Sequence, residues 1–409
     1  MMRKRFASRA RAVAVAVSRA TAMALLAWYA PAVAGQAPGV AMPEVPVVEG
    51  PTLHPASGWP VWIKDYTTGD RTEKTSDIVF AGRAADGARG FFLVDEVGML
   101  RWCRVSQRDD TGRVTLRLER VATGGGFAPM LRDNFIWDFE ALTLVPHVDL
   151  RAGGATLPDS IEGWLSLEGR GSGYVPQTNV FAVVLRRQRG ESAAPGPSGR
   201  VEPAPIPTWR IDGRGEVFPR GHFWKGQIGP DRGITGIGVA PRLAFLGLSR
   251  GEPGDEISTA GTLIYVYDRE LRRVAYVGTR GLGIYSIGGI DAWSDTLAVV
   301  LDRERASIFV LRWDDAVPGQ VNEAYRFPLD LPGPGNFRYA IPRLEGVAVD
   351  DTGDIWCVID PEHGHYRAME AVPESVLVYM AAEIPMLYRF PGEQVWKTVG
   401  VMPSGDRGK

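Results

Sequence analysis

The alternation of apolar and polar residues predicts many short β-strands and no long helix. From residue 75 onward, apolar runs of about five to eight residues are separated by turns rich in Gly, Asp and Pro. One unit recurs: a short apolar strand, a more apolar strand that ends in an acid or Ser, and two strands with alternating large residues. The chain is therefore predicted to be all-β.

Five copies of this unit are visible, and their first strands read SDIVFAG, FEALTLVP, ITGIGVAP, SIGGIDAW and LEGVAVDDTG. Aligned on Asp77, Glu140, Thr235, Gly288 and Glu345, the copies are 63, 95, 53 and 57 residues apart. The longest spacing contains a Pro-, Gly- and Ser-rich segment at 189–207, which is expected to be a surface loop. A β-solenoid would need shorter repeats, and a β-sandwich would not repeat an acidic position. The pattern therefore predicts a β-propeller with five recognisable four-stranded blades.

Two segments bear on how the ring closes. PVWIKDYT at 60–67 is expected either to pair into the last blade or to belong to a sixth, degenerate blade. In the last copy, VWKTVGV at 395–401 is expected to form the fourth strand.

The N-terminus matches an export signal. A basic region is followed by an apolar run at 20–30 and by the small residues Ala32-Val33-Ala34, which fit a cleavage site. The predicted organisation is a signal peptide at 1–34, a linker or N-terminal arm at 35–57 and one propeller domain at 58–409. The protein is then secreted or periplasmic. Because Arg19 interrupts the upstream side of the apolar run, an uncleaved anchor is the alternative.

The charge of the mature chain limits its partners. Residues 1–34 hold six basic and no acidic residues, which leaves 40 Lys and Arg (46 minus six) against 48 Asp and Glu. A net charge near −8 argues against nucleic acid and against anionic membrane lipid as partners. It is compatible with a bound cation, and a monomer acting on a small anionic or ester substrate is expected.

The two cysteines, Cys103 and Cys357, lie in the apolar strand patterns RWCRV and IWCVI. A core of this size does not need disulfides, so two buried free thiols are expected. A disulfide between them would require contact between the first and last blades, which a closed ring would allow.

Acidic residues recur at two places in the repeat. They begin the first strand at Asp77, Glu140 and Glu345, and they end the second strand at Asp95, Glu168, Asp302 and Asp360. In a propeller these positions gather round one mouth of the channel, where a cation would offset the repulsion between carboxylates. Oxygen ligands suit calcium, so the predicted ligands are Glu140, Glu168, Glu345, Asp360, Asp95 and Asp302. The alternative is that the acids cap turns.

Basic residues near the same mouth are candidates for binding an anionic substrate. They are Lys225, Arg232, Arg343 and Arg170. Guanidinium groups beside a metal serve phosphoryl transfer and hydrolysis, because both stabilise charge on oxygen. The alternative is a set of ordinary surface side chains.

Three other motifs give weaker support for a function. GLSRG at 247–251 matches G-x-S-x-G, but no helix follows and Ser249 occupies the acidic position of the repeat. His222, His363 and His365 lack partners that would indicate a zinc site or a general base. Paired carboxylates also fit a glycosidase, and strand tryptophans such as Trp164 and Trp356 fit either a sugar site or packing between blades.

Two blades also carry a family resemblance. DFEALT followed by LSLEG, and LEGVAVDDTGDIW followed by VID, resemble blades of the phytase-like, or esterase-like, β-propellers. The last copy is similar, more loosely, to gluconolactonase- and arylesterase-type propellers. The resemblance spans about residues 75–400 and implies a calcium-dependent hydrolase of phosphate or carboxylic esters, with Glu140, Glu168 and Glu345 at the catalytic centre. The alternative is a non-catalytic propeller that binds a protein or glycan and holds a structural cation.

Overall fold

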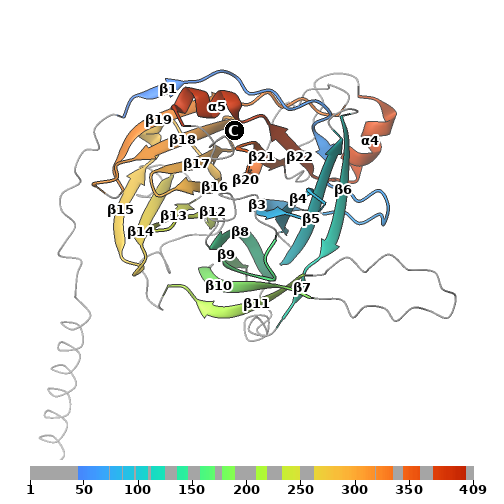
Figure 1. Cartoon of the computed structure of the whole chain (residues 1–409), viewed down its shortest axis with the longest axis horizontal. Helices are drawn as coiled ribbons and strands as arrows, with labels where there is room; N and C mark the ends of the chain where they lie inside the picture. The colour runs from blue at the N-terminus through green and yellow to red at the C-terminus, as the bar shows by residue number, and fades with distance from the viewer. Residues whose placement is uncertain are drawn as a thin grey trace, which may run out of the picture. The chain divides into compact units, whose positions relative to one another are not determined.

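The computed structural model describes residues 45–401 except 73, 85, 96–97, 109–111, 125–135, 146–156, 171–176, 189–208, 219–232, 249–261, 318, 335–343 and 360–371. In this part of the chain, five β-sheets are arranged in a ring (Figure 1). The predicted five-bladed β-propeller is confirmed, and the described residues hold no sixth blade. No helix among them is long and apolar enough to cross a membrane.

Each blade is built from consecutive strands, apart from the last. Blade 1 comprises β3 (Thr75–Arg83), β4 (Arg89–Asp95), β5 (Met99–Arg108) and β6 (Arg113–Arg120). Blade 2 comprises β8 (Ile136–Val145), β9 (Ser160–Arg170), β10 (Gln177–Arg187) and β11 (Trp209–Glu216). Blade 3 comprises β12 (Ile234–Val239), β13 (Leu243–Leu248), β14 (Leu263–Asp268) and β15 (Arg273–Gly278), followed by η1 (Arg280–Leu282). Blade 4 comprises β16 (Ile287–Ser294), β17 (Leu297–Asp302), β18 (Ser307–Trp313) and β19 (Val321–Pro328). Blade 5 comprises β20 (Leu344–Val349), β21 (Ile355–Ile359), β22 (Met386–Phe390) and β2 (Val61–Trp62).

The ring is closed by the N-terminal part of the propeller. Strand β2 pairs with β22, with Val61 opposite Leu387 and Trp62 opposite Met386. Of the two alternatives for residues 60–67, the structure shows the pairing into the last blade, and no sixth blade is seen in the described chain. The fourth strand of blade 5 therefore comes from the segment that precedes blade 1 in the sequence.

The predicted fourth strand at 395–401 is wrong. Residues Glu393–Val399 form the helix α5, which buries Val395, Trp396 and Val399 on one face. This spacing of apolar residues fits a helical face, and the place next to β22 is already taken by β2. A second short helix, α4, spans Glu374–Ala381.

Two blades gain a fifth strand at the outer edge. β1 (Val47–Glu49) pairs in parallel with β19, and β7 (Ala122–Thr123) pairs in parallel with β11. Part of the predicted N-terminal arm therefore lies on blade 4.

The core lies between the faces of neighbouring blades. Strand β17 (LAVVLD) is buried along its whole length because both faces of blade 4 pack against adjacent blades. The outermost strand β6 instead alternates, with Leu116 and Leu118 buried and its arginines more exposed. Cys103 and Cys357 are buried free thiols, as predicted, and burial raises the pKa of each well above its usual range.

The innermost strands β3, β8, β12, β16 and β20 each contact the innermost strands of both neighbouring blades. Glycines permit the closest approaches. A Cβ atom on Gly346 would lie 2.6 Å from the Cα of Asp77, and one on Gly289 would lie 2.9 Å from the amide nitrogen of Val347. The described part of the channel is therefore lined by closely packed backbone.

Candidate functional site

A β-bulge recurs in the first half of every innermost strand. The register against the second strand shifts at Ser76, Glu140, Thr235, Gly288 and Glu345. Four of these are the positions on which the sequence copies align. In blade 1 the alignment on Asp77 is wrong by one residue, because the bulged residue is Ser76. A bulge turns its side chain away from the regular alternation, which explains a polar residue in an apolar strand.

The hydroxyl groups of the Ser and Thr residues at these bulges connect adjacent blades by hydrogen bonds. Ser76 Oγ donates to the carbonyl of Phe139 at 2.6 Å, and Thr235 Oγ1 donates to the carbonyl of Ile287 at 2.7 Å. Both acceptors come directly before the bulge of the next blade. In these two blades the recurring polar position has a structural role.

Glu345, a predicted catalytic residue and metal ligand, forms an ion pair with Arg303 of blade 4. The distance between Oε2 and Nη1 is 2.8 Å, and the two side chains are 6% and 15% exposed. Arg303 also donates to the carbonyl of Ile287 at 3.3 Å. The negative charge predicted to attract calcium is thus balanced by a guanidinium from the chain itself.

Asp302 and Asp95 end the second strands of blades 4 and 1, and both are fully buried. The Asp302 carboxylate accepts hydrogen bonds from the backbone N–H groups of Tyr285, Ser286 and Glu304 at 3.1–3.2 Å. Burial raises the pKa of Asp302, and these N–H groups oppose the rise because they favour the charged form. Asp302 therefore organises the turn around it.

The other predicted site residues are described less fully. Glu140 is half-buried in the bulge of β8, while Glu168 and Arg170 lie on β9 opposite Asp138 and Ile136. Lys225, Arg232, Arg343 and Asp360 lie outside the described residues, as do Ser249, His222, His363 and His365. Within the described ranges, no group of three or more His, Cys, Asp or Glu residues could hold a metal ion.

Two buried carboxyls in the channel connect neighbouring blades. Asp77 accepts the backbone N–H of Leu142 at 2.9 Å, and Asp291 accepts that of Val349 at 2.6 Å. Burial raises the pKa of Asp77 well above its usual range; the N–H groups of Leu142 and Ile78 oppose this, and Asp291 adds to it. Asp291 lies outside the aligned acidic positions and was not among the predicted site residues.

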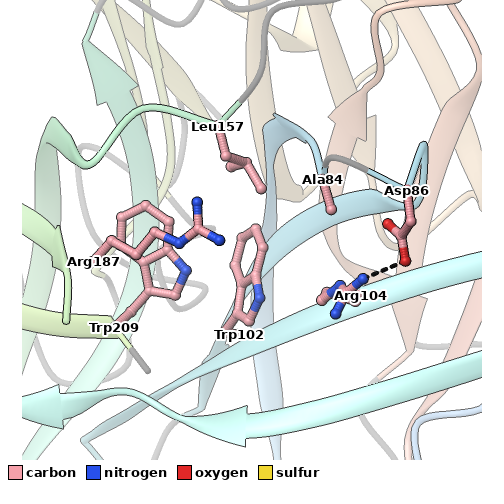
Figure 2. Close-up of a pocket in the computed structure, with 7 residues that line it drawn as sticks. All are labelled: Ala84, Asp86, Trp102, Arg104, Leu157, Arg187 and Trp209. Carbon is pink, nitrogen blue, oxygen red and sulfur yellow. Dashed lines mark hydrogen bonds and ion pairs between the residues drawn. The ribbon is translucent and has the colours of Figure 1, made fainter. Parts of the chain in front are cut away.

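A pocket of about 200 Å³ lies between blades 1 and 2, on the side of the ring where the innermost strands end. Figure 2 shows its lining, which comprises Ala84, Asp86, Trp102, Arg104, Leu157, Arg187 and Trp209. The bulges that contain Glu140 and Glu345 lie in the first half of their strands, away from this end. The pocket is thus separate from the predicted metal site.

Aromatic rings form the floor of this pocket. The ring centroids of Trp102 and Trp209 are 5.4 Å apart, and Phe92 lies behind them at 4.9 Å and 5.2 Å. Trp102 comes from β5 and Trp209 from β11, so each blade supplies one indole. Gly90 makes room for the first, because a Cβ there would meet the Trp102 ring at 2.1 Å.

Two arginines supply the charge. Arg104 donates to the carboxylate of Asp86, while its Nε is buried without a hydrogen-bond partner. Arg187 forms no ion pair with an acidic side chain in the described part of the chain, and Figure 2 shows its guanidinium directed from the Trp209 side towards Trp102. The guanidinium of Arg187 is therefore not held in an ion pair among the described residues, although the carboxyl of Glu119 interacts with it electrostatically.

Glu119 lies next to the residues that line the pocket. It is directly opposite Trp102 in the pairing of β5 with β6. Both carboxyl oxygens are buried, and neither has a hydrogen-bond partner among the described residues. Burial raises the pKa of Glu119 to about 7, although Arg104 and Arg187 lower it and Asp65 adds to the rise. Such a group changes its charge near neutral pH.

This pocket could not be predicted from the sequence. Trp102, Glu119, Arg187 and Trp209 are not adjacent in the chain and fall outside the recurring acidic positions. The only available signal was the presence of Trp and Arg on the outer strands of the first two copies, which packing between blades explains equally well.

No family model matches the chain, and no curated protein is significantly similar to it. Among solved structures, the chain is similar to luciferin-regenerating enzyme, with 9% identity, a TM-score of 0.36, and 82% and 96% of the two chains covered. It is also similar to a calcium-binding protein, regucalcin, from Agrobacterium tumefaciens, with 9% identity, a TM-score of 0.34, and 85% and 97% of the two chains covered. A third similar structure is a PQQ-bound aldose sugar dehydrogenase from Streptomyces coelicolor, with 10% identity, a TM-score of 0.34, and 82% and 99% of the two chains covered. Similarity at this level transfers no function, and the propeller assignment stands on the strand order itself.

Proposed function

We propose that this protein is an exported, monomeric β-propeller that binds a small organic anion in the pocket between blades 1 and 2. The observation that carries this proposal is the placement of Arg187, whose guanidinium faces the tryptophan rings of the pocket and forms no ion pair among the described residues. Export follows from the predicted signal peptide at 1–34.

The chemistry of the lining selects the ligand. Indole rings provide flat apolar surface, and a guanidinium binds carboxylate, sulfonate or phosphate oxygens through charge-assisted hydrogen bonds. Such a hydrogen bond gains strength where water is largely excluded. A volume of about 200 Å³ is smaller than that of most sites for drug-sized molecules, which favours a ligand of one or two rings.

Isothermal titration of the full mature chain with benzoate, benzenesulfonate and benzamide tests this function. The two anions are expected to bind and to compete with each other. Benzamide has the shape of benzoate but no charge, so its affinity is expected to be at least about tenfold lower, which is the contribution of one charge-assisted hydrogen bond. Equal binding of benzamide and benzoate, or no binding of either anion, would overturn the proposal.

The second candidate function is a calcium-dependent hydrolase of phosphate or carboxylic esters, of the phytase-like kind, at the opposite mouth. It is favoured by Glu140, a half-buried acid in the bulge of β8, with Glu168 on the neighbouring strand. Calcium would be expected to raise the melting temperature and EDTA to lower it. p-Nitrophenyl phosphate or acetate would be turned over, and the turnover would be lost in Glu140→Gln. A melting temperature indifferent to calcium and EDTA would exclude the calcium-dependent form of this candidate.

A further inference from the structure

We propose that the anion enters the pocket together with one proton, which is taken up by the carboxylate of Glu119. This inference rests on the proposed function, since it concerns the same pocket. It assigns to Glu119 a role that neither the recurring acids nor the resemblance indicates.

The position of Glu119 is the first argument. Directly opposite residues on antiparallel strands have neighbouring side chains on one face, so Glu119 lies against Trp102 on the face that meets blade 2. Arg104 is two residues from Trp102 on β5, and Arg117 is two residues from Glu119 on β6. Because side chains alternate along a strand, both arginines lie on this same face. Glu119 is therefore part of the wall around the ligand, although it does not itself line the pocket.

The lack of partners is the second argument. Buried carboxylate oxygens in proteins are normally hydrogen-bonded, and each unpaired one is costly. Both oxygens of Glu119 are buried without a partner among the described residues. This environment favours the neutral acid over the carboxylate.

The surrounding charges are the third argument. Glu119 faces Arg104 from β5, Arg117 from β6, Arg187 from β10 and Asp65 from the segment before β3. The charge of Arg104 is shared with Asp86. In the empty pocket the Glu119 carboxylate competes with any anion for Arg187.

The consequence is a linkage between ligand and proton. When an anion binds, its negative charge lies near Glu119, which disfavours the carboxylate and favours the acid. A proton then moves from solvent to one Oε of Glu119, and the total charge of the pocket is preserved. Because the pKa of Glu119 is about 7 in the free protein, this uptake grows as the pH rises through neutrality, and the affinity falls in the same range.

Calorimetry with benzenesulfonate tests the linkage, since this probe stays ionised throughout the range. Titrations at about pH 6, 7 and 8, each in two buffers of different ionisation enthalpy, count the protons taken up. We expect close to zero protons to be taken up per bound anion at pH 6 and close to one at pH 8. Above neutrality the affinity should fall by up to about tenfold per pH unit. Glu119→Gln is expected to bind at pH 8 as tightly as the wild type does at pH 6, without proton uptake.

The outcomes separate the two proposals. Binding with no proton uptake and no dependence on pH overturns the role of Glu119 and leaves the binding function intact. Binding that strengthens as the pH rises also overturns it. Absence of binding by benzenesulfonate and benzoate at every pH overturns the binding function itself. The wild-type proton count does not depend on the variant, so the test stands even if Glu119→Gln folds poorly.

Discussion

Arg187→Met is expected to weaken the binding of benzoate by about 10- to 150-fold. A hydrogen bond between a charged donor and a carboxylate contributes about 1.5–3 kcal/mol, which corresponds to that range of dissociation constants. Methionine keeps an apolar stem of similar length, so the contacts along the side chain largely remain. Arg187 is half-buried at the end of β10, and its backbone N–H bond to Asp159 is unaffected by the change. Calorimetry at about pH 6 measures the loss.

Arg186→Met is the matched control. Arg186 is the preceding residue of β10, so its side chain lies on the other face of the strand. It is 54% exposed, and its Nε is 4.0 Å from the carboxylate of Asp212. An exposed pair of this kind contributes little, so both binding and stability should stay close to those of the wild type. An equal loss of affinity in the two variants would indicate general attraction of anions by the surface and would contradict a specific role for Arg187.

Glu345→Gln is expected to lower the free energy of unfolding by about 3 kcal/mol, the usual cost of removing one partner of a buried ion pair. The change keeps the shape of the side chain but leaves the guanidinium of Arg303 without its counter-charge. Arg303 is only 15% exposed and its Nε already lacks a hydrogen-bond partner, so water cannot fully replace the carboxylate. Urea denaturation monitored by circular dichroism measures the difference.

The double variant Glu345→Gln/Arg303→Met distinguishes an ion pair from a metal ligand. If Glu345 serves to balance Arg303, removal of both charges should recover most of the lost stability, since a buried pair replaced by apolar groups is often neutral. If Glu345 instead holds calcium, the single variant would lose any calcium-dependent rise in melting temperature and the double variant would not restore it. That second pattern would support the predicted metal site.

Many features of the fold can be predicted from the sequence because they depend on local pattern. The apolar runs bounded by turns define most strands, and their repetition defines the blades. Two buried free cysteines were likewise predictable from the apolar strands that contain them. The segment at 60–67 carried enough apolar residues to be identified as a strand, although the sequence left open whether it closed the ring.

Other features depend on which segments compete for one place. The segment at 395–401 fits a strand or a helix when considered alone, because a short apolar run has no unambiguous period. In the structure, β2 occupies the edge of β22, and Val395, Trp396 and Val399 are buried as one face of α5 instead. Likewise, the register of the bulge in blade 1 follows from the pairing of β3 with β4, which places Ser76 rather than Asp77 at the recurring position.

The sequence by itself determined the class of protein: an all-β chain of repeated four-stranded units, with acids at two recurring places in the repeat. Only the tertiary structure decided what two of those acids do, since the partner of Glu345 and the amides around Asp302 lie on other strands and turns. It also decided where a ligand could bind. Trp102 and Trp209 are more than a hundred residues apart, and only the packing of blade 1 against blade 2 brings their rings to 5.4 Å. Strand pattern is local, whereas a pocket between blades is made by residues that meet only when neighbouring blades pack against each other.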